Sequence, residues 1–274
     1  MIYNYGVMQG RLSNKIGNKI QAFPEKNWKL EFSKAKKIGL KSIEWTLDYK
    51  NFEKNPIFSK KGQLEIKRLS KKYSIKIKSL TGDCFMERPF WKIKNNTKLL
   101  SDLKKIIESS KKIGIKFIVI PLVDKGSLNS NSEIKCFLDN CKIIKKDLKK
   151  TKIKLIFESD FNPVKLKKFI NKFDKRYFGI NYDAGNSACL NYNIDNEFKL
   201  YGNRINNIHI KDRIKFGKTV RLGKGNVDFL KLFKNIKKIK YKKNLILQTA
   251  RSEKNEHIKE ISINLKYLEK FHNV

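Results

Sequence analysis

The chain has 274 residues, and its 63 Lys and Arg residues outnumber its 26 Asp and Glu residues to give a formal net charge of +37. The length fits one domain of about 250 residues over positions 1–274. No apolar stretch approaches the ~18 residues of a membrane span, and MIYNYGVMQGRL does not read as a signal peptide. These observations predict a cytoplasmic protein with no membrane partner.

The positive charge is spread along the chain rather than gathered in one motif. Only eight of the 63 basic residues are Arg and the others are Lys, distributed over nearly every expected helix. No arginine-rich arm, aromatic RNA-binding run or zinc-finger spacing appears. We therefore expect no specific nucleic-acid partner, although the charge could steer an anionic substrate. The four Cys residues form no CxxC pair, which indicates free thiols in a reducing compartment.

Short apolar runs alternate with amphipathic segments from one end of the chain to the other. The predicted strands, in chain order, are Tyr5–Met8, Ser42–Trp45, Ile75–Leu80, Phe117–Pro121, Lys154–Glu158, Phe178–Tyr182, Ile205–His209 and Leu245–Gln248. The predicted helices lie near residues 28–38, 60–73, 97–113, 133–150, 164–172, 196–202, 228–238 and 255–271, the seventh of them with Asp228 as its N-cap.

Eight successive strand–helix units favour a closed parallel barrel, a single (β/α)8 TIM barrel. A doubly wound open sheet is the alternative. Such sheets usually carry a Gly-rich phosphate loop after the first strand. Here the first strand runs into MQGRLS, which has one Gly and no GxGxxG pattern.

Four polar residues close the last four predicted strands: Glu158, Asp183, His209 and Gln248. Because the carboxyl ends of barrel strands meet at one rim, these side chains should converge. Two carboxylates, an imidazole and an amide oxygen suit a divalent metal ion. Glu158 could also take a proton from a carbon next to a polarised carbonyl. The simpler alternatives are that Glu158 only marks a strand end in solvent and that Asp183 only serves the turn at Gly185.

Further polar or aromatic residues follow the same strand ends and could contact a substrate. Trp45 could cover the apolar face of a sugar, or could equally belong to the core. Arg251 could clamp a phosphate or hydroxyl group. The predicted substrate-binding residues are Glu44, Trp45, Asn186, Lys211, Asp212, Arg213 and Arg251.

The chain resembles the sugar phosphate isomerase/epimerase superfamily, the xylose isomerase-like TIM barrels. The resemblance is carried in order by GVMQGRLS, QAFP, IEW, FES, DAGN, HIKDR, GKGNVDF and LILQTAR. It implies a (β/α)8 barrel with a divalent metal, Mn²⁺ first and Mg²⁺, Co²⁺ or Zn²⁺ as alternatives. It transfers metal-ligand roles to Glu158, Asp183 and His209. Sugar epimerases of this group usually place a second Glu where this chain has Gln248, so a mechanism with two carboxylate bases is in doubt.

The resulting expectation is a metal-dependent sugar or sugar-phosphate isomerase/epimerase. A metal-dependent sugar or polyol dehydratase, a lyase, is the alternative within enzymes. A catalytically inactive sugar-binding barrel is a further alternative, which Gln248 makes conceivable, and a nucleic-acid-binding repair protein ranks below these. The expected partner is a small-molecule sugar or sugar phosphate, and assembly into a homo-oligomer stays open.

Overall fold

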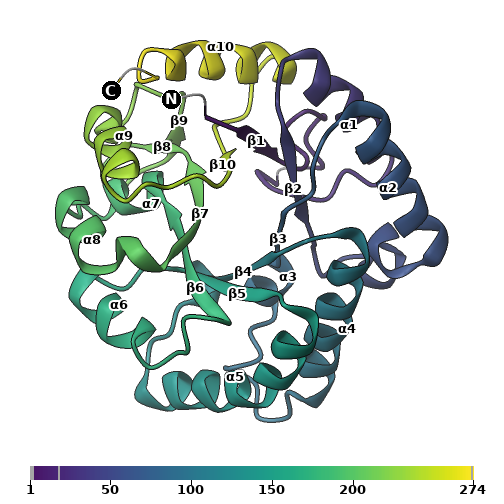
Figure 1. The fold of residues 1–274 in the computed structure, drawn as a ribbon, viewed down its shortest axis with the longest axis vertical. Helices are drawn as coiled ribbons and strands as arrows, with labels where there is room; N and C mark the ends of the chain where they lie inside the picture. The colour runs from purple at the N-terminus through teal and green to yellow at the C-terminus, as the bar shows by residue number, and fades with distance from the viewer. Residues whose placement is uncertain (1–2, 18, 273) are drawn as a thin grey trace.

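The computed structural model describes residues 3–17, 19–272 and 274, and its centre is a closed barrel of parallel strands (Figure 1). Around the barrel the strands follow the order β1, β10, β7, β6, β5, β4, β3, β2. Their bounds are β1 (Tyr5–Met8), β2 (Ser42–Thr46), β3 (Ser79–Thr81), β4 (Phe117–Leu122), β5 (Lys154–Ser159), β6 (Phe178–Asp183), β7 (Ile205–Ile210) and β10 (Leu245–Leu247). The expected (β/α)8 barrel is confirmed.

Helices surround the barrel on the outside (Figure 1). They are α1 (Trp28–Lys37), α2 (Lys60–Tyr73), α4 (Thr97–Ile113), α5 (Asn131–Thr151), α6 (Pro163–Ile170), α8 (Ile194–Tyr201), α9 (Phe229–Lys238) and α10 (His257–Glu269). The Asp228 side chain accepts a hydrogen bond of 2.9 Å from the Lys231 amide, which confirms the predicted N-cap of α9. In the described part of the chain, no helix combines the length and apolar character that crossing a bilayer requires.

The third strand begins later than the sequence pattern indicates. Ile75 and Ile77 are buried, as a strand would require, but Lys76 forms only an isolated bridge with Ser42. The regular ladder with β4 starts at Ser79, which pairs with Phe117. The apolar pattern correctly predicts burial here, but burial does not by itself fix where backbone pairing begins.

Several short elements lie between the main strands and helices and were not predicted. They are α3 (Asp83–Glu87), α7 (Ala184–Cys189), the antiparallel hairpin of β8 (Asp212–Arg213) and β9 (Thr219–Val220), and the single-turn segments η1 (Phe52–Lys54), η2 (Pro56–Phe58), η3 (Asp124–Gly126) and η4 (Gly202–Arg204). Such elements are too short to show a hydrophobic period. Those that follow β3, β6 and β7 build the carboxyl-terminal rim of the barrel.

Alternation along the strands separates an apolar outer layer from a polar inner one. On β5, Phe157 faces the helices, with its ring centroid 5.1 Å from Phe137 and 5.0 Å from Phe173. The neighbouring Glu158 points to the other side and meets His209 inside the barrel. The outer layer thus supplies the hydrophobic core, while the inner layer is free to carry polar groups at the carboxyl-terminal end.

Candidate active site

Glu158, Asp183 and His209 lie together where β5, β6 and β7 end. One donor atom of each lies within 4.8 Å of the others. Glu158 Oε2 is 3.2 Å and Asp183 Oδ2 is 3.9 Å from His209 Nδ1. Asp183 and His209 are directly paired in the register of β6 and β7, which fixes their approach. All three residues are buried. The structure therefore brings together three of the four residues predicted to hold a metal.

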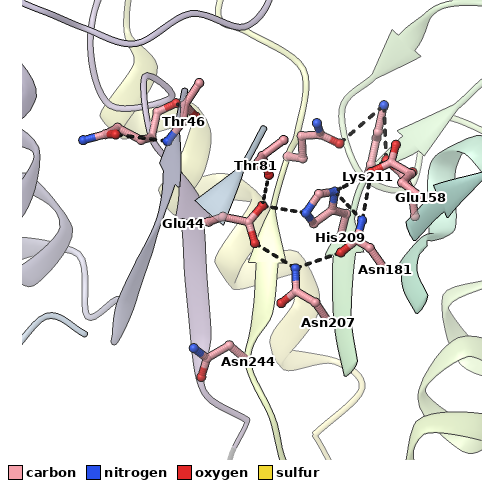
Figure 2. A network of polar contacts seen from close by, with 12 residues as sticks. Glu44, Thr46, Thr81, Glu158, Asn181, Asn207, His209, Lys211 and Asn244 are labelled. Atoms are coloured by element: carbon pink, nitrogen blue, oxygen red, sulfur yellow. Dashed lines mark hydrogen bonds and ion pairs between the residues drawn. The ribbon is translucent and has the colours of Figure 1, made fainter. Parts of the chain in front are cut away.

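Glu44 holds the opposite edge of the His209 ring (Figure 2). Its Oε1 lies 2.7 Å from His209 Nε2, and both side chains are fully buried. Glu44 also accepts hydrogen bonds from Thr81 Oγ1 and from Asn207 Nδ2. Burial works to lower the pKa of His209, but Glu44 and Glu158 outweigh it and raise the pKa to about 10. Glu44 lies inside the barrel and orients His209 so that Nδ1 faces the two carboxylates. Its predicted contact with a substrate stays a prediction.

Two asparagine side chains hold the carboxylate of Glu158. Asn181 Nδ2 donates to Oε2 at 2.8 Å, and Asn186 Nδ2 donates to Oε1 at 2.8 Å. Burial works to raise the pKa of Glu158, but His209 and Lys211 outweigh it and leave the pKa below its ordinary value. The charges of His209 and Lys211 thus favour the ionised carboxylate and the two asparagines fix its orientation, which suits a proton acceptor at neutral pH.

Lys211 connects Gln248 to the cluster. Its Nζ lies 3.3 Å from Asp183 Oδ2, 3.1 Å from Asn186 Oδ1 and 3.5 Å from Gln248 Oε1. Burial raises the pKa of Asp183, with Lys211 acting against the rise. Gln248 follows β10 and donates its backbone N–H to Ile210 O, so its position at the rim is fixed. Its amide oxygen reaches the cluster through the Lys211 ammonium.

The remaining predicted substrate residues occupy different surroundings. Arg213 Nη1 donates to Asn186 Oδ1 at 2.8 Å and so borders the cluster. Asp212 accepts hydrogen bonds from the backbone amides of Gly223, Gly225 and Val227, which fixes the loop before α9. Arg251 donates from its two terminal nitrogens to carbonyl oxygens of the loop that follows β1.

Trp45 lies in the outer core layer. It is fully buried, with its ring centroid 5.4 Å from Phe23 and 5.6 Å from Trp28. Its Nε1 donates to Asn55 Oδ1 at 3.1 Å. Because neighbouring residues of a strand face opposite sides, Trp45 points outward when Glu44 points inward. Its surroundings favour the core role that the sequence left open.

Comparison with known proteins agrees with this architecture. A family model described as the xylose isomerase-like TIM barrel matches residues 32–271. The chain belongs to this family. A protein of Haemophilus influenzae provisionally named L-ribulose-5-phosphate 3-epimerase SgbU is 26% identical over 260 residues, covering 89% of this chain and 91% of that protein.

Solved structures share the fold at low sequence identity. A xylose isomerase domain protein from Planctomyces limnophilus has a TM-score of 0.77 at 13% identity, covering 98% of this chain and 97% of that one. The IolI protein with a bound zinc atom gives 0.76 at 17% identity, covering 99% and 100%. D-psicose 3-epimerase of Clostridium cellulolyticum H10 with D-tagatose gives 0.75 at 12% identity, covering 98% and 99%.

The cluster of this xylose isomerase-like barrel has the chemistry of a divalent cation site. Glu158, Asp183 and His209 offer two hard oxygen donors and one nitrogen donor from three adjacent strands. The contact of Glu44 with Nε2 leaves Nδ1 as the donor, and a carboxylate behind a ligand histidine is a recurrent support in metal sites. Three buried carboxylates, Glu44, Glu158 and Asp183, face only two basic groups, His209 and Lys211, so a cation would be stabilised beside them. The donors present therefore fit a divalent ion.

The contact between Glu44 and His209 leads to a prediction for metal affinity. We expect Glu44→Gln to weaken binding of Mn²⁺ by ~10–100-fold, because the substitution removes the charge that orients and polarises the imidazole. Isothermal titration calorimetry on metal-free protein measures the change. Glu65→Gln on the surface of α2 is the matched control and should leave the affinity unaltered; equal affinities for Glu44→Gln and this control would show that Glu44 does not support a metal ligand.

Some residues of the site were not predicted from the sequence. Asn181 and Asn207 precede Asp183 and His209 by two positions and so face the barrel interior; this spacing was the available signal. Asp83 is the first residue of α3, two residues after β3 ends, and lies near enough to Glu158 for that carboxylate to raise its pKa. Its carboxyl is buried with Oδ2 unpartnered, and burial holds its pKa well above the ordinary value.

Proposed function

We propose that the protein is a metal-dependent isomerase or epimerase of a sugar or sugar phosphate, with Glu158 as the proton-transfer group. The observation that carries this proposal is the ionised, doubly hydrogen-bonded Glu158 carboxylate 3.2 Å from His209 Nδ1 and beside Asp183. The name of the Haemophilus relative supports a ketose phosphate as substrate and epimerisation as the reaction.

The proposed chemistry starts at the carbon next to the substrate carbonyl. A divalent ion held by Glu158, Asp183 and His209 would polarise that carbonyl and acidify the adjacent C–H bond. Glu158 then takes the proton, and the electron pair of the C–H bond moves toward the carbonyl oxygen. Asn181 and Asn186 keep the carboxylate oriented during the transfer. Glu158, once its proton has exchanged with solvent, returns a proton to the former carbonyl carbon, and the hydroxyl proton of the first carbon passes to the former carbonyl oxygen. These two transfers complete an aldose–ketose exchange with one base.

Gln248 favours this one-base reaction over symmetric two-base epimerisation. A side-chain amide cannot accept a proton near neutral pH, so the rim of β10 lacks the second carboxylate that the two-base reaction uses.

Dehydration is the second candidate, and Lys211 favours it. Its ammonium lies 3.1 Å from Asn186 Oδ1 and 3.3 Å from Asp183 Oδ2, where it could protonate a departing hydroxyl group.

Proton exchange with solvent tests the proposal directly. The Mn²⁺-loaded protein is incubated in D2O with a panel of ketoses and ketose 5-phosphates, and deuterium in recovered substrate and product is followed by NMR. We expect incorporation at the carbon next to the carbonyl. Loss of a hydroxyl group with formation of a deoxy-keto product would select dehydration. Metal binding with no exchange on any sugar would favour an inactive sugar-binding barrel.

A further inference from the structure

A buried carboxylate on α8 lies behind the candidate active site. Glu197 is 2% exposed and accepts hydrogen bonds from three hydroxyl groups. Tyr182 Oη donates to Oε2 at 3.0 Å, Tyr201 Oη donates to Oε1 at 2.6 Å, and Ser187 Oγ also donates to Oε2. Within the described residues no basic side chain pairs with Glu197, and burial raises its pKa. A buried carboxylate without a cation is costly, so its three hydrogen bonds call for an explanation beyond packing.

Two of the three donors belong to segments that carry residues of the cluster. Tyr182 directly precedes Asp183 on β6 and faces the helices, because neighbouring residues of a strand face opposite sides. Ser187 directly follows Asn186 on α7. The third donor lies on α8 itself, four residues after the carboxylate. Glu197 therefore ties both β6 and α7 to α8, next to the positions of Asp183 and Asn186.

The short helix α7 depends on such ties for its position. It has six residues, and an isolated helix of fewer than ~12 residues is at best marginal in water. Asn186 on this helix donates to Glu158 Oε1 at 2.8 Å and accepts from Lys211 Nζ at 3.1 Å. The helix also packs tightly, because a Cβ atom at Gly185 would lie 2.7 Å from Lys211 Cγ. A small shift of α7 would thus alter the hydrogen bonds of both Glu158 and Lys211.

The cluster and the hydroxyl network share one small cavity. Its volume is about 20 Å³, and its lining includes Glu158, Asp183 and Asn186 of the cluster as well as Ser187 and Glu197 of the network. A cavity of this size holds about one water molecule. The two networks therefore lie against each other with little free volume, and truncation of Glu197 would give α7 room to move.

We propose that Glu197 is a positioning residue that fixes Asp183 and Asn186 in the cluster. It acts on Asp183 through the end of β6 and on Asn186 through α7, and it touches neither the metal nor the substrate. Asn186 in turn orients the Glu158 carboxylate. This inference rests on the proposed function only for the reaction that Glu158 would perform, because the placement of the two residues requires neither metal nor sugar.

Backbone hydrogen exchange in the metal-free, full-length protein tests this placement. The Asn186 amide donates to Asp183 Oδ1, so its exchange rate reports local opening at the start of α7. We expect Glu197→Ala and Ser187→Ala each to accelerate this exchange about tenfold or more, the effect of losing one buried hydrogen bond. Tyr201→Phe is the matched control. It removes one hydrogen bond from the same carboxylate, leaves the bonds toward β6 and α7 in place, and should change the rate less than about twofold.

Metal binding and turnover give a second measurement. Glu197→Ala should weaken Mn²⁺ binding ~10-fold, at the lower end for loss of a group that supports metal ligands. At saturating Mn²⁺ it should lower turnover by up to ~10²-fold, because small misplacements of a catalytic group are costly. Glu197→Gln should recover most of both, since its amide can still hydrogen-bond the hydroxyls. Arg204→Met removes three buried hydrogen bonds just before β7, at the opposite end of that strand from His209, and should lower thermal stability without either effect.

The outcomes separate positioning from the proposed function. An unchanged Asn186 exchange rate in Glu197→Ala, equal acceleration by Tyr201→Phe, or equal loss of Mn²⁺ affinity in Arg204→Met would overturn the proposal. If Glu197→Ala does not fold by circular dichroism, Ser187→Ala decides. Faster Asn186 exchange in both variants of a protein that exchanges no proton on any ketose would leave the positioning role intact and refute only the proposed reaction.

Discussion

Glu158→Gln should lower turnover at least ~10²-fold, the typical effect of losing a general base. The substitution keeps the shape of the side chain but replaces the carboxylate that accepts hydrogen bonds from Asn181 and Asn186. The substitution also removes a charged metal ligand, so the loss is assigned to the proton-transfer step only at saturating Mn²⁺. Deuterium incorporation from solvent into a ketose, compared with the wild type at saturating substrate and Mn²⁺, measures it.

Two companion variants sharpen the interpretation. Glu65→Gln, on the surface of α2, should exchange protons at the wild-type rate. Gln248→Glu should retain the metal and add epimerisation at C3, because it introduces a second carboxylate at the rim of β10. If Glu158→Gln exchanges protons as fast as the wild type, another group is the base. Glu44 and Asp212 are then the next candidates, and each would have to leave its present contacts, with His209 and with three backbone amides respectively.

Asp183→Asn should weaken metal binding by more than the ~100-fold that loss of a supporting residue can cause, because it removes a charged ligand. Asp183 has a second role that this variant preserves. Its Oδ1 accepts a hydrogen bond of 2.8 Å from the Asn186 amide at the start of α7, and Asn is an equally good N-cap. Mn²⁺ titration should thus show weaker binding, while the free energy of unfolding measured without metal should stay at the wild-type value.

Asp183→Ala separates the two roles. It should lose the metal as Asp183→Asn does, and should also lower the free energy of unfolding by about 1 kcal/mol because the cap is gone. Asp228→Ala, which removes the cap of α9 away from the cluster, should lower stability similarly and leave Mn²⁺ affinity unchanged. Wild-type metal affinity in Asp183→Asn would exclude Asp183 as a ligand.

The barrel and the cluster were largely predictable because they depend on periodic patterns. Apolar runs of four to six residues followed by amphipathic segments indicate strand–helix units, and a polar residue at the end of each later strand must lie at the common rim. The places of Glu158, Asp183 and His209 at the ends of their strands were enough to predict that these side chains lie together. These residues predicted a divalent metal site, and the resemblance to a known superfamily added the expected metal and the expected class of reaction.

What was missed depends on contacts between distant segments. Glu44 and His209 are 165 residues apart, and no local pattern indicates that they touch. The sequence left open whether Trp45 belongs to the core or to the site. The side of β2 that a side chain faces depends on the strand register, and the sequence does not show that Glu44 points into the barrel. Glu197 lies on a helix, and its contacts with β6 and α7 depend on the packing of α8, which the sequence does not specify.

The pairing of β1 with β10 has a consequence for how the chain folds. Tyr5 and Leu245 are neighbours in the barrel although about 240 residues separate them, and contacts of such long range form slowly because a large loop must close first. During folding, β5 to β7 can pair locally and bring Glu158 near His209, while Glu44 arrives only when the first two strands dock. Pulse-labelled hydrogen exchange should therefore find β5–β7 protected before β1 and β10. Tight Mn²⁺ binding should appear when β1 and β10 become protected.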